Sequence, residues 1–558
     1  MEDSGPRTGW RRHTGSRGYP RGGRSRYASH DCRPHDGSNA LIRTSLLGLA
    51  RHSLVLGALA APAGAQARIP PHFDAEVTRA LGAFQVPGAA IVVVKDGKVI
   101  LAKGYGVQRV GDRTPSDPHT LFQIASMTKA FTAASLAMLV DSGKIGWDDP
   151  VIRYLPDFQL FDPWVTREIT IRDLLTHRSG LGLGAGDLLW LHSDYSRKEI
   201  IYRMRAARPV SSFRSQYAYD NVLYAVAGEI IPAVTGLSWE EFVRRRIFAP
   251  LGMTESRTGV ADLAAGDRLA AAHGVSGGAI RIIPLDTVDN IGPAASIISS
   301  ATDLAKWVIA QLDSGRMGST RLWSARQTRE MWSPQTIMPI SDPRSALAAT
   351  RPNFAAYGLG WRVRDYRGRK LVWHTGGLAG MTSKTTLVPE LRLGIIMLTN
   401  GESSMYEALT YGLLDHFFGA PAKDWIAAYH AAARQDQASA DSEMAALRRS
   451  RDTTARPSLP LARYAGRYTD ALYGDATITL ENNVLVLRFT RSPAFVGDLL
   501  YWGYETFRTN WRTPNLADAF VTFTLKPGGA VEQFTMDAVS PLADFSYDYQ
   551  DFRFVPVR

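Results

Sequence analysis

The stretch LFQIASMTKAFTAASLAMLV, Leu121 to Val140, places a serine and a lysine in an otherwise apolar run. Ser126 and Lys129 are three residues apart, so on a helix they share one face. Serine is a poor nucleophile at neutral pH and needs a base that takes its proton. Lys129 can be that base if apolar surroundings lower its pKa by desolvation. The stretch therefore predicts a buried helix that begins at Ser126, whose first N–H groups favour a developing oxyanion.

Two further motifs can complete such a site. Tyr219-Asp220-Asn221 precedes a helical run, so a phenol and an amide two residues apart can point into one cleft. The sequence His374-Thr375-Gly376-Gly377 follows an expected strand, and its glycines would let substrate backbone approach closely. Each motif alone also fits ordinary core residues. A Ser-x-x-Lys alone also fits a helix cap, and about one is expected by chance in a chain of this length.

In this order and at these separations, the three motifs resemble the serine β-lactamase and penicillin-binding superfamily. The resemblance is greatest to the class C type, with its esterase, D-aminopeptidase and DD-peptidase relatives. It covers roughly Phe73 to Phe418. The connecting segments that carry it further are SMTKAFTAASLAMLVDSGKI, ITIRDLLTHRSGL, IFAPLGMTES, ISSATDLAKW and WHTGG.

The resemblance implies a role for each member of the three motifs. Ser126 would be the acylated nucleophile, Lys129 its base and Tyr219 the relay that carries the proton to the leaving group. The N–H groups of Ser126 and Gly377 would form the oxyanion hole. The residues that would bind substrate or its oxyanion are Asn221, His374, Thr375, Gly376 and Gly377. No cofactor is implied, and the histidines after residue 67 lack the spacing of metal ligands.

One departure from the class C pattern bears on the substrate. Class C enzymes have Lys-Thr-Gly where this chain has His374-Thr375-Gly376. A lysine stays charged and attracts the carboxylate of a β-lactam, whereas a histidine with a pKa near 6.5 is mostly neutral at pH 7. The histidine therefore favours the peptidase and esterase relatives over a strong β-lactamase. His177, in LLTHRSGL, is interpreted as a structural residue at a helix end.

The pattern of expected strands and helices predicts an α+β fold. AAIVVVKDGKVILAKGYG predicts a hairpin around Asp96-Gly97, and more strands are expected between residues 357 and 400. Helical segments fill the middle of the region. We therefore expect an antiparallel sheet flanked by helices, with an all-helical subdomain beside it, over residues 68–432.

The remainder of the chain predicts a second, smaller domain. Residues 433–460 are charged and rich in alanine, which predicts a helical or flexible linker. Residues 461–558 alternate apolar and polar residues around turns such as Asn482-Asn483, which predicts a small antiparallel β-barrel. This module resembles the lipocalin-like domains found after such catalytic domains. We expect it to pack beside the cleft.

The N-terminus predicts export. RHSLVLGALAAPAGAQA, residues 51–67, has the basic flank, short apolar stretch and Ala65-Gln66-Ala67 end of a secretory signal, with cleavage after Ala67. The apolar stretch is too short for a stable membrane span. Residues 1–67 are therefore expected to be a lead-in and signal peptide, and the mature protein to be periplasmic or secreted. The first 40 residues are either a tail or a mispredicted start.

Charge and cysteine usage exclude several function classes. The net charge is +11, but residues 1–67 contribute +6 of it, and the rest is thinly spread. Nucleic acid is therefore not an expected partner. The single cysteine, Cys32, precedes the cleavage site, so neither a thiol nucleophile nor a Cys-ligated metal is expected.

These patterns together predict an exported serine hydrolase. It would act through an acyl-enzyme on peptide, amide or ester bonds of a small-molecule or peptide substrate. One alternative is a class C-like β-lactamase. The other is a binding protein that is acylated by β-lactams or muropeptides without turnover. The sequence leaves the natural substrate and the oligomeric state open.

Overall fold

The structure, a computed structural model, describes residues 68–557 with the exception of residue 277. The described residues belong to one compact unit. The predicted signal peptide and its cleavage site lie outside the described residues.

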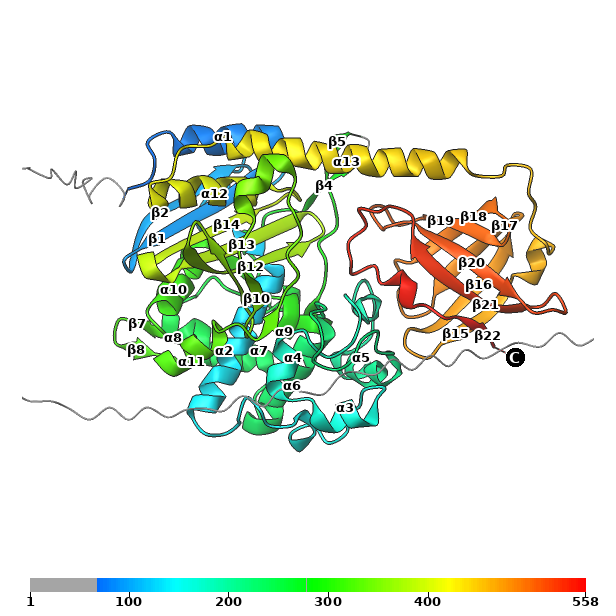
Figure 1. The fold of residues 1–558 in the computed structure, drawn as a ribbon, viewed down its shortest axis with the longest axis horizontal. Helices are drawn as coiled ribbons and strands as arrows, with labels where there is room; N and C mark the ends of the chain where they lie inside the picture. Colours follow the sequence, from blue (N-terminus) through cyan, green and yellow to red (C-terminus); the bar gives the residue numbers. More distant parts are fainter. Residues whose placement is uncertain (1–67, 277, 558) are drawn as a thin grey trace, which may run out of the picture. The chain divides into compact units, whose positions relative to one another are not determined.

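An eight-stranded antiparallel sheet forms the centre of the first domain (Figure 1). The predicted hairpin is confirmed: β1 (Gly88–Lys95) and β2 (Lys98–Gly106) are joined by Asp96-Gly97, both at positive φ, as a tight two-residue turn requires. Strand β1 also pairs with β14, so strands from both ends of the domain share one sheet. The order is β2-β1-β14-β13-β12-β11-β10-β9. The remaining strands are β9 (Thr336–Ile337), β10 (Ala355–Tyr357), β11 (Arg362–Tyr366), β12 (Arg369–Leu378), β13 (Met381–Val388) and β14 (Leu393–Thr399).

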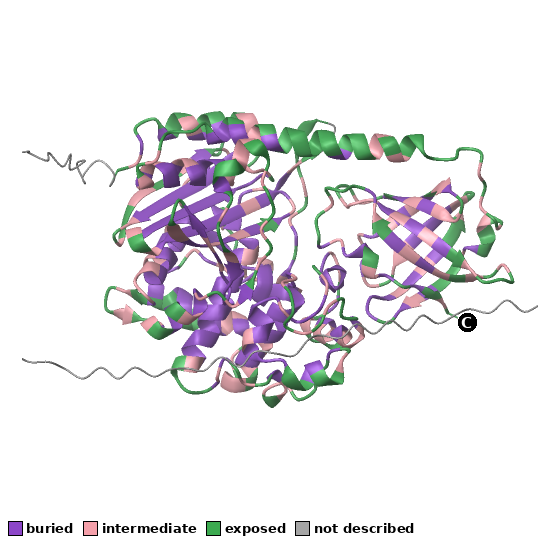
Figure 2. Cartoon of the chain, viewed as in Figure 1, coloured by how far each residue is buried: buried purple, intermediate pink, exposed green. Residues whose placement is uncertain are grey.

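Both faces of the sheet are buried in its central strands, such as β1 and β14, whereas the edge strand β2 is largely exposed or half-buried. Along β1, Val92 and Val94 belong to the larger core, whereas Ile91 and Val93 belong to the smaller one. This alternation follows from the two-residue period of a strand. The layer on the smaller core consists of α1 (Phe73–Phe84), α12 (Met405–Phe418) and the first part of α13 (Trp425–Arg449). Figure 2 shows the central strands of the sheet as buried and the later turns of α13 as largely exposed.

The other face of the sheet is covered by the helical part of the domain. Its central helix, α2 (Thr128–Asp141), is buried on every side except at its last two residues. The predicted all-helical region is therefore present, although one hairpin in it was not predicted, β4 (His273–Ser276) with β5 (Ala279–Ile282). The other helices here are α3 (Pro163–Glu168), α4 (Ile171–Leu175), α5 (Arg197–Arg203), α6 (Val222–Thr235), α7 (Trp239–Val243), α8 (Ala249–Leu251), α9 (Gly292–Ala295), α10 (Ala301–Leu312) and α11 (Ala325–Met331).

Besides the hairpin of β4 and β5, two short strand pairs complete this domain. They are β3 (Leu121–Gln123) with β6 (Ile298–Ser300), and β7 (Arg316–Met317) with β8 (Thr320–Arg321).

No single helix among the described residues is long and apolar enough to cross a membrane. Helix α6 together with Trp239–Leu251 meets that test only as a pair bent by 76°.

The C-terminal domain is a nearly closed eight-stranded antiparallel barrel, as predicted. An antiparallel bridge between Phe534 in β21 and Phe554, just before β22, links the two ends of the strand order and nearly closes the barrel. The predicted linker is largely helical, since α13 begins at Trp425 and continues to Arg449. The barrel strands are β15 (Gly466–Asp470), β16 (Gly474–Glu481), β17 (Val484–Phe489), β18 (Val496–Gly503), β19 (Thr506–Trp511), β20 (Ala519–Leu525), β21 (Val531–Ala538) and β22 (Val555–Pro556).

Candidate active site

Ser126 lies in a tight turn directly before the central helix. The turn is a 3₁₀ helix, Ala125–Met127, and α2 begins at Thr128 rather than at Ser126, where the sequence predicted its start. Ala125 has φ of 46°, a left-handed conformation that residues with a Cβ seldom adopt. Ser126 is half-buried and lines a cavity of about 210 Å³. The strained turn therefore holds the serine at the edge of a space that can accept a substrate.

The side chain of Lys129 is fully buried beside this serine. Its Nζ lies 2.9 Å from Ser126 Oγ, 2.7 Å from Asn221 Oδ1 and 3.1 Å from the carbonyl oxygen of Ala294. Burial lowers the pKa of Lys129 to about 7, although the charge of Asp187 opposes this shift. The amine is therefore partly neutral at physiological pH and can accept the proton of Ser126.

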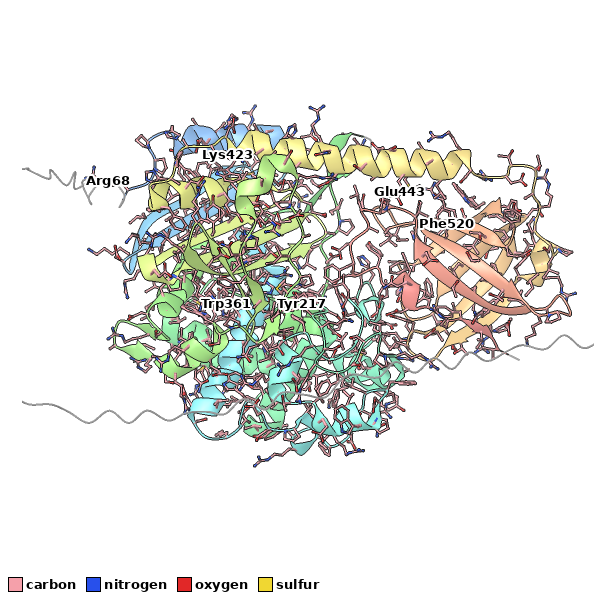
Figure 3. The ribbon with its side chains drawn as sticks, viewed as in Figure 1. Arg68, Tyr217, Trp361, Lys423, Glu443 and Phe520 are labelled. Carbon is pink, nitrogen blue, oxygen red and sulfur yellow. The ribbon has the colours of Figure 1, made fainter. Side chains whose placement is uncertain are left out.

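Tyr219 and Asn221 enter the site from the loop before α6. Tyr217, labelled in Figure 3, precedes them, and its ring packs 5.9 Å from that of Tyr357. Tyr219 is 5% exposed, and Lys129 Nζ lies 4.8 Å from its ring centroid. Burial raises the pKa of Tyr219. Tyr219 therefore keeps its proton at neutral pH, which leaves the role of base to Lys129.

Strand β12 forms the opposite wall of the cavity, with His374, Thr375, Gly376 and Gly377. His374 Nε2 lies 2.8 Å from the hydroxyl of Tyr357, and Nδ1 lies 2.6 Å from the carbonyl oxygen of Thr375. Because a carbonyl only accepts, Nδ1 carries the proton and Nε2 accepts from the tyrosine. Burial and the charge of Arg362 lower the pKa of His374 well below its usual value. The imidazole is therefore neutral at pH 7.

Gly376 allows β12 to approach the serine turn. A Cβ at this position would lie 2.0 Å from the carbonyl oxygen of Ile124 and 2.5 Å from Ser383 Oγ. Any other residue would push the strand away from Ser126. At Gly377, by contrast, a Cβ would meet no atom within 4 Å, and the residue is exposed. The first glycine thus sets the width of the cavity, and the second leaves backbone open to a substrate.

The structure brings all eight predicted site residues to one place, and it adds two that sequence reasoning did not find. Asp187 is fully buried and accepts a 2.8 Å hydrogen bond from Asn221 Nδ2. Arg362 lines the cavity next to Ser126 and also a neighbouring cavity on the sheet side. His177 does not line the active-site cavity. It is buried, and its Nδ1 accepts from the N–H of Asp220.

The described residues hold no group of three or more His, Cys, Asp or Glu side chains that could bind a metal ion.

Comparison with known proteins gives a family match for the first domain and a separate model match for the C-terminal domain. A family model described as Beta-lactamase matches residues 73–422, and one described as a domain of unknown function (DUF3471) matches residues 450–556. The unguisins hydrolase ungD' of Aspergillus campestris is 31% identical over 442 residues, 74% of this chain and 78% of that protein. Penicillin-binding protein 4 of Amycolatopsis lactamdurans is 30% identical over 329 residues, 57% of this chain and 81% of that protein.

Two solved structures have a similar fold. The octameric penicillin-binding protein homologue from Pyrococcus abyssi has a TM-score of 0.55 and 22% identity, with coverage of 83% of this chain and 97% of that one. The D-amino acid amidase from Ochrobactrum anthropi SV3 has a TM-score of 0.51 and 25% identity, with coverage of 62% and 98%. The chain therefore belongs to the beta-lactamase family of serine hydrolases.

Proposed function

We propose that this protein is an exported serine hydrolase that cleaves amide, peptide or ester bonds through an acyl-enzyme on Ser126. The observation that carries the proposal is the buried Lys129 amine, 2.9 Å from Ser126 Oγ, with its pKa lowered to about 7. A neutral amine at that distance is a competent general base for a serine. The hydrolases and the D-amino acid amidase among its relatives support the same chemistry.

The arrangement supports a two-step reaction. Ser126 Oγ attacks the substrate carbonyl carbon while Lys129 takes the hydroxyl proton, and the N–H groups of Ser126 and Gly377 stabilise the oxyanion. The leaving group departs with a proton returned from Lys129 through the hydroxyl of Tyr219. Water then attacks the ester on Ser126, releases the acid and restores the serine hydroxyl. Tyr219 suits this relay because burial keeps it protonated at neutral pH and it lines the same cavity as Ser126.

Arg362 bears on the choice of substrate. His374 is neutral, so it does not replace the charged lysine of the class C pattern. The guanidinium of Arg362 lies 5.6 Å from the Tyr219 ring and lines the cavity. Within the described residues it forms no salt bridge, and its buried Nε has no hydrogen-bond partner. A guanidinium in this position suits a substrate carboxylate. This favours substrates that end in a carboxylate near the scissile bond.

A panel of substrates tests the function. The mature protein is assayed with D-amino acid amides, D-alanyl-D-alanine peptides, p-nitrophenyl esters and nitrocefin. We expect saturable hydrolysis of amides or esters, and slower turnover of nitrocefin. Fast turnover of nitrocefin alone would instead favour a β-lactamase. A stable penicillin adduct without hydrolysis of any compound would favour a binding protein.

The rate of acylation should depend on pH through Lys129. Below pH 7 the amine is protonated and cannot take the serine proton, so the rate rises with pH and levels off above about 8. We expect a single ascending limb with a midpoint near 7, measured as the rate of fluorophosphonate labelling. A midpoint near 10, the range of an exposed lysine, would show that burial does not set the pKa of this base.

Replacing Arg362 with methionine should weaken the binding of substrates that carry a carboxylate. Loss of a charged hydrogen bond predicts a rise in KM of about 10-fold or more for a D-alanyl-D-alanine peptide. KM for a neutral p-nitrophenyl ester should change little. Arg362→Lys, which keeps the charge, serves as the matched control. An equal effect on both substrates would assign Arg362 to packing rather than to carboxylate binding.

A further inference from the structure

A segment of the C-terminal domain forms part of the active-site cavity. We call residues 540–548, which connect β21 to the 3₁₀ turn Tyr549–Asp551, the docking segment. Three of its residues line the cavity that contains Ser126, namely Asp544, Phe545 and Ser546. The cavity is therefore built by two domains that match separate family models.

A buried aspartate anchors the docking segment to the first domain. Asp548 is fully buried and accepts the backbone N–H of Gly186 at 2.7 Å and of Leu188 at 3.1 Å. It also accepts the hydroxyl of Tyr473 from its own domain. These bonds fix the turn that carries Asp187, because the donors lie on either side of that residue.

The docking segment also covers the tyrosine of the site. The Phe545 ring packs edge-on against the Tyr219 ring, with 5.7 Å between centroids and an interplanar angle of 86°. Gly184 permits this approach, since a Cβ there would lie 2.7 Å from the carbonyl oxygen of Phe545. Phe545 remains 37% exposed, so it forms the outer wall of the cavity rather than its floor.

A chain of hydrogen bonds leads from this segment to the nucleophile. Ser546 Oγ donates to Asp187 Oδ2 at 2.8 Å, and the same carboxylate oxygen accepts Asn221 Nδ2 at 2.8 Å. The oxygen of the same amide, Asn221 Oδ1, accepts a hydrogen bond from Lys129 Nζ at 2.7 Å. Lys129 in turn reaches Ser126 Oγ. The hydrogen bond to Asp187 thus fixes the orientation of the Asn221 amide, so that its oxygen faces the Lys129 amine.

The surroundings of Asp187 fit its ionised form. Its side-chain oxygens accept from Ser546, from Asn221 and from Trp190 Nε1 at 2.7 Å. Asn221 Nδ2 and Trp190 Nε1 can only donate, so of the three partners only the Ser546 hydroxyl could accept a hydrogen from a protonated carboxyl. The charge of Asp187 interacts with four other ionisable groups, namely Lys129, Tyr219, Asp220 and Asp548. Burial raises the pKa of Asp187 to about 7, and the hydrogen bonds from Trp190, Ser546 and Asn221 oppose the rise.

We propose that the C-terminal domain takes part in catalysis by positioning the general base, with Ser546 holding Asp187, Asp187 orienting Asn221, and Asn221 holding the Lys129 amine against Ser126. Ser546 is thus a positioning residue for a reaction in which it does not touch substrate. The inference rests on the proposed acyl transfer at Ser126. It assigns the DUF3471 domain a role within the site, in addition to packing beside it.

Substitution of Ser546 in the mature full-length protein tests the inference. Ser546→Ala removes the hydroxyl, Ser546→Thr keeps it, and Ser540→Ala is the matched control at an exposed serine of the same segment. Labelling by a fluorophosphonate is followed as a function of reagent concentration and pH. We expect Ser546→Ala to lower the maximal acylation rate about 10-fold without changing the half-saturating concentration. Its ascending pH limb should shift to lower pH, because Asp187 with one donor fewer holds its proton longer, and the negative charge that raises the pKa of Lys129 is then lost.

The controls separate positioning from folding. Ser546→Thr should restore both the rate and the pH limb, and Ser540→Ala should match the wild type. If Ser546→Ala kept the wild-type rate and pH limb, the inference would be wrong while the proposed function would stand. A loss that Thr does not restore and that parallels a fall in Tm would also overturn the inference. Absence of any labelling of the wild type would overturn the proposed function, and the inference with it.

Discussion

Ser126→Ala abolishes hydrolysis in this account. Every step of the proposed reaction forms or breaks a bond to Ser126 Oγ, and no other hydroxyl lies within hydrogen-bond reach of Lys129 Nζ in the described structure. By analogy with other serine hydrolases, removal of the nucleophile lowers kcat by about 10⁶-fold. The measurement is kcat with the best amide or ester of the substrate panel.

The control for this variant is another serine at the far end of the same helix. Ser142 is exposed, and its hydroxyl bonds only to the carbonyl oxygen of Leu139 among the described residues. Ser142→Ala should retain wild-type kcat. Residual activity of Ser126→Ala above one hundredth of the wild type would point to a different nucleophile.

Lys129→Met should lower the acylation rate by about 10³-fold, the contribution expected of a general base. Methionine fills a similar volume, so Ser126 and the cavity remain, but no group accepts the serine proton. Tyr219 cannot take over that role, because burial keeps it protonated. The rate of fluorophosphonate labelling measures the effect. The labelling that remains should also lose its midpoint near pH 7.

An exposed lysine just after α2 provides the comparison. Lys144→Met should leave both the rate and the pH profile unchanged, since Lys144 lies on the surface. If Lys129→Met labelled at the wild-type rate, the base would have to be another group. His177 would then be the first residue to test, because its ring centroid lies 4.3 Å from that of Tyr219.

Much of the fold and the site can be predicted from the sequence because their signals are local. The Asp96-Gly97 turn between two β-branched runs determines the first hairpin. The apolar run around Lys129 indicates a helix buried on almost every side. Three short motifs, each of few residues, supply eight residues, of which seven line one cavity and the eighth, Lys129, lies directly behind Ser126. In each case neighbouring residues in the sequence carry the information.

The features that were missed depend on contacts between distant parts of the chain. The sequence around Asp187, GAGDLLW, has only the pattern of a loop, and nothing in it predicts a partner in the C-terminal domain. Which of Arg362, Arg364 and Arg367 reaches the cavity depends on the position of β11 beside the loop of Tyr219. The helix start was placed at Ser126 because nothing in the sequence predicts an alanine at positive φ just before it.

The central claim is that Ser126 is an activated nucleophile, and the most direct test is mass spectrometry of the mature protein after reaction with a fluorophosphonate or a penicillin. We predict one adduct per chain, located by proteolysis on the peptide that contains Ser126 and absent from Ser126→Ala. Its lifetime with penicillin separates a hydrolase from a binding protein. An adduct on another residue, or none on the wild type, would contradict the assignment of Ser126 and Lys129 as the catalytic pair.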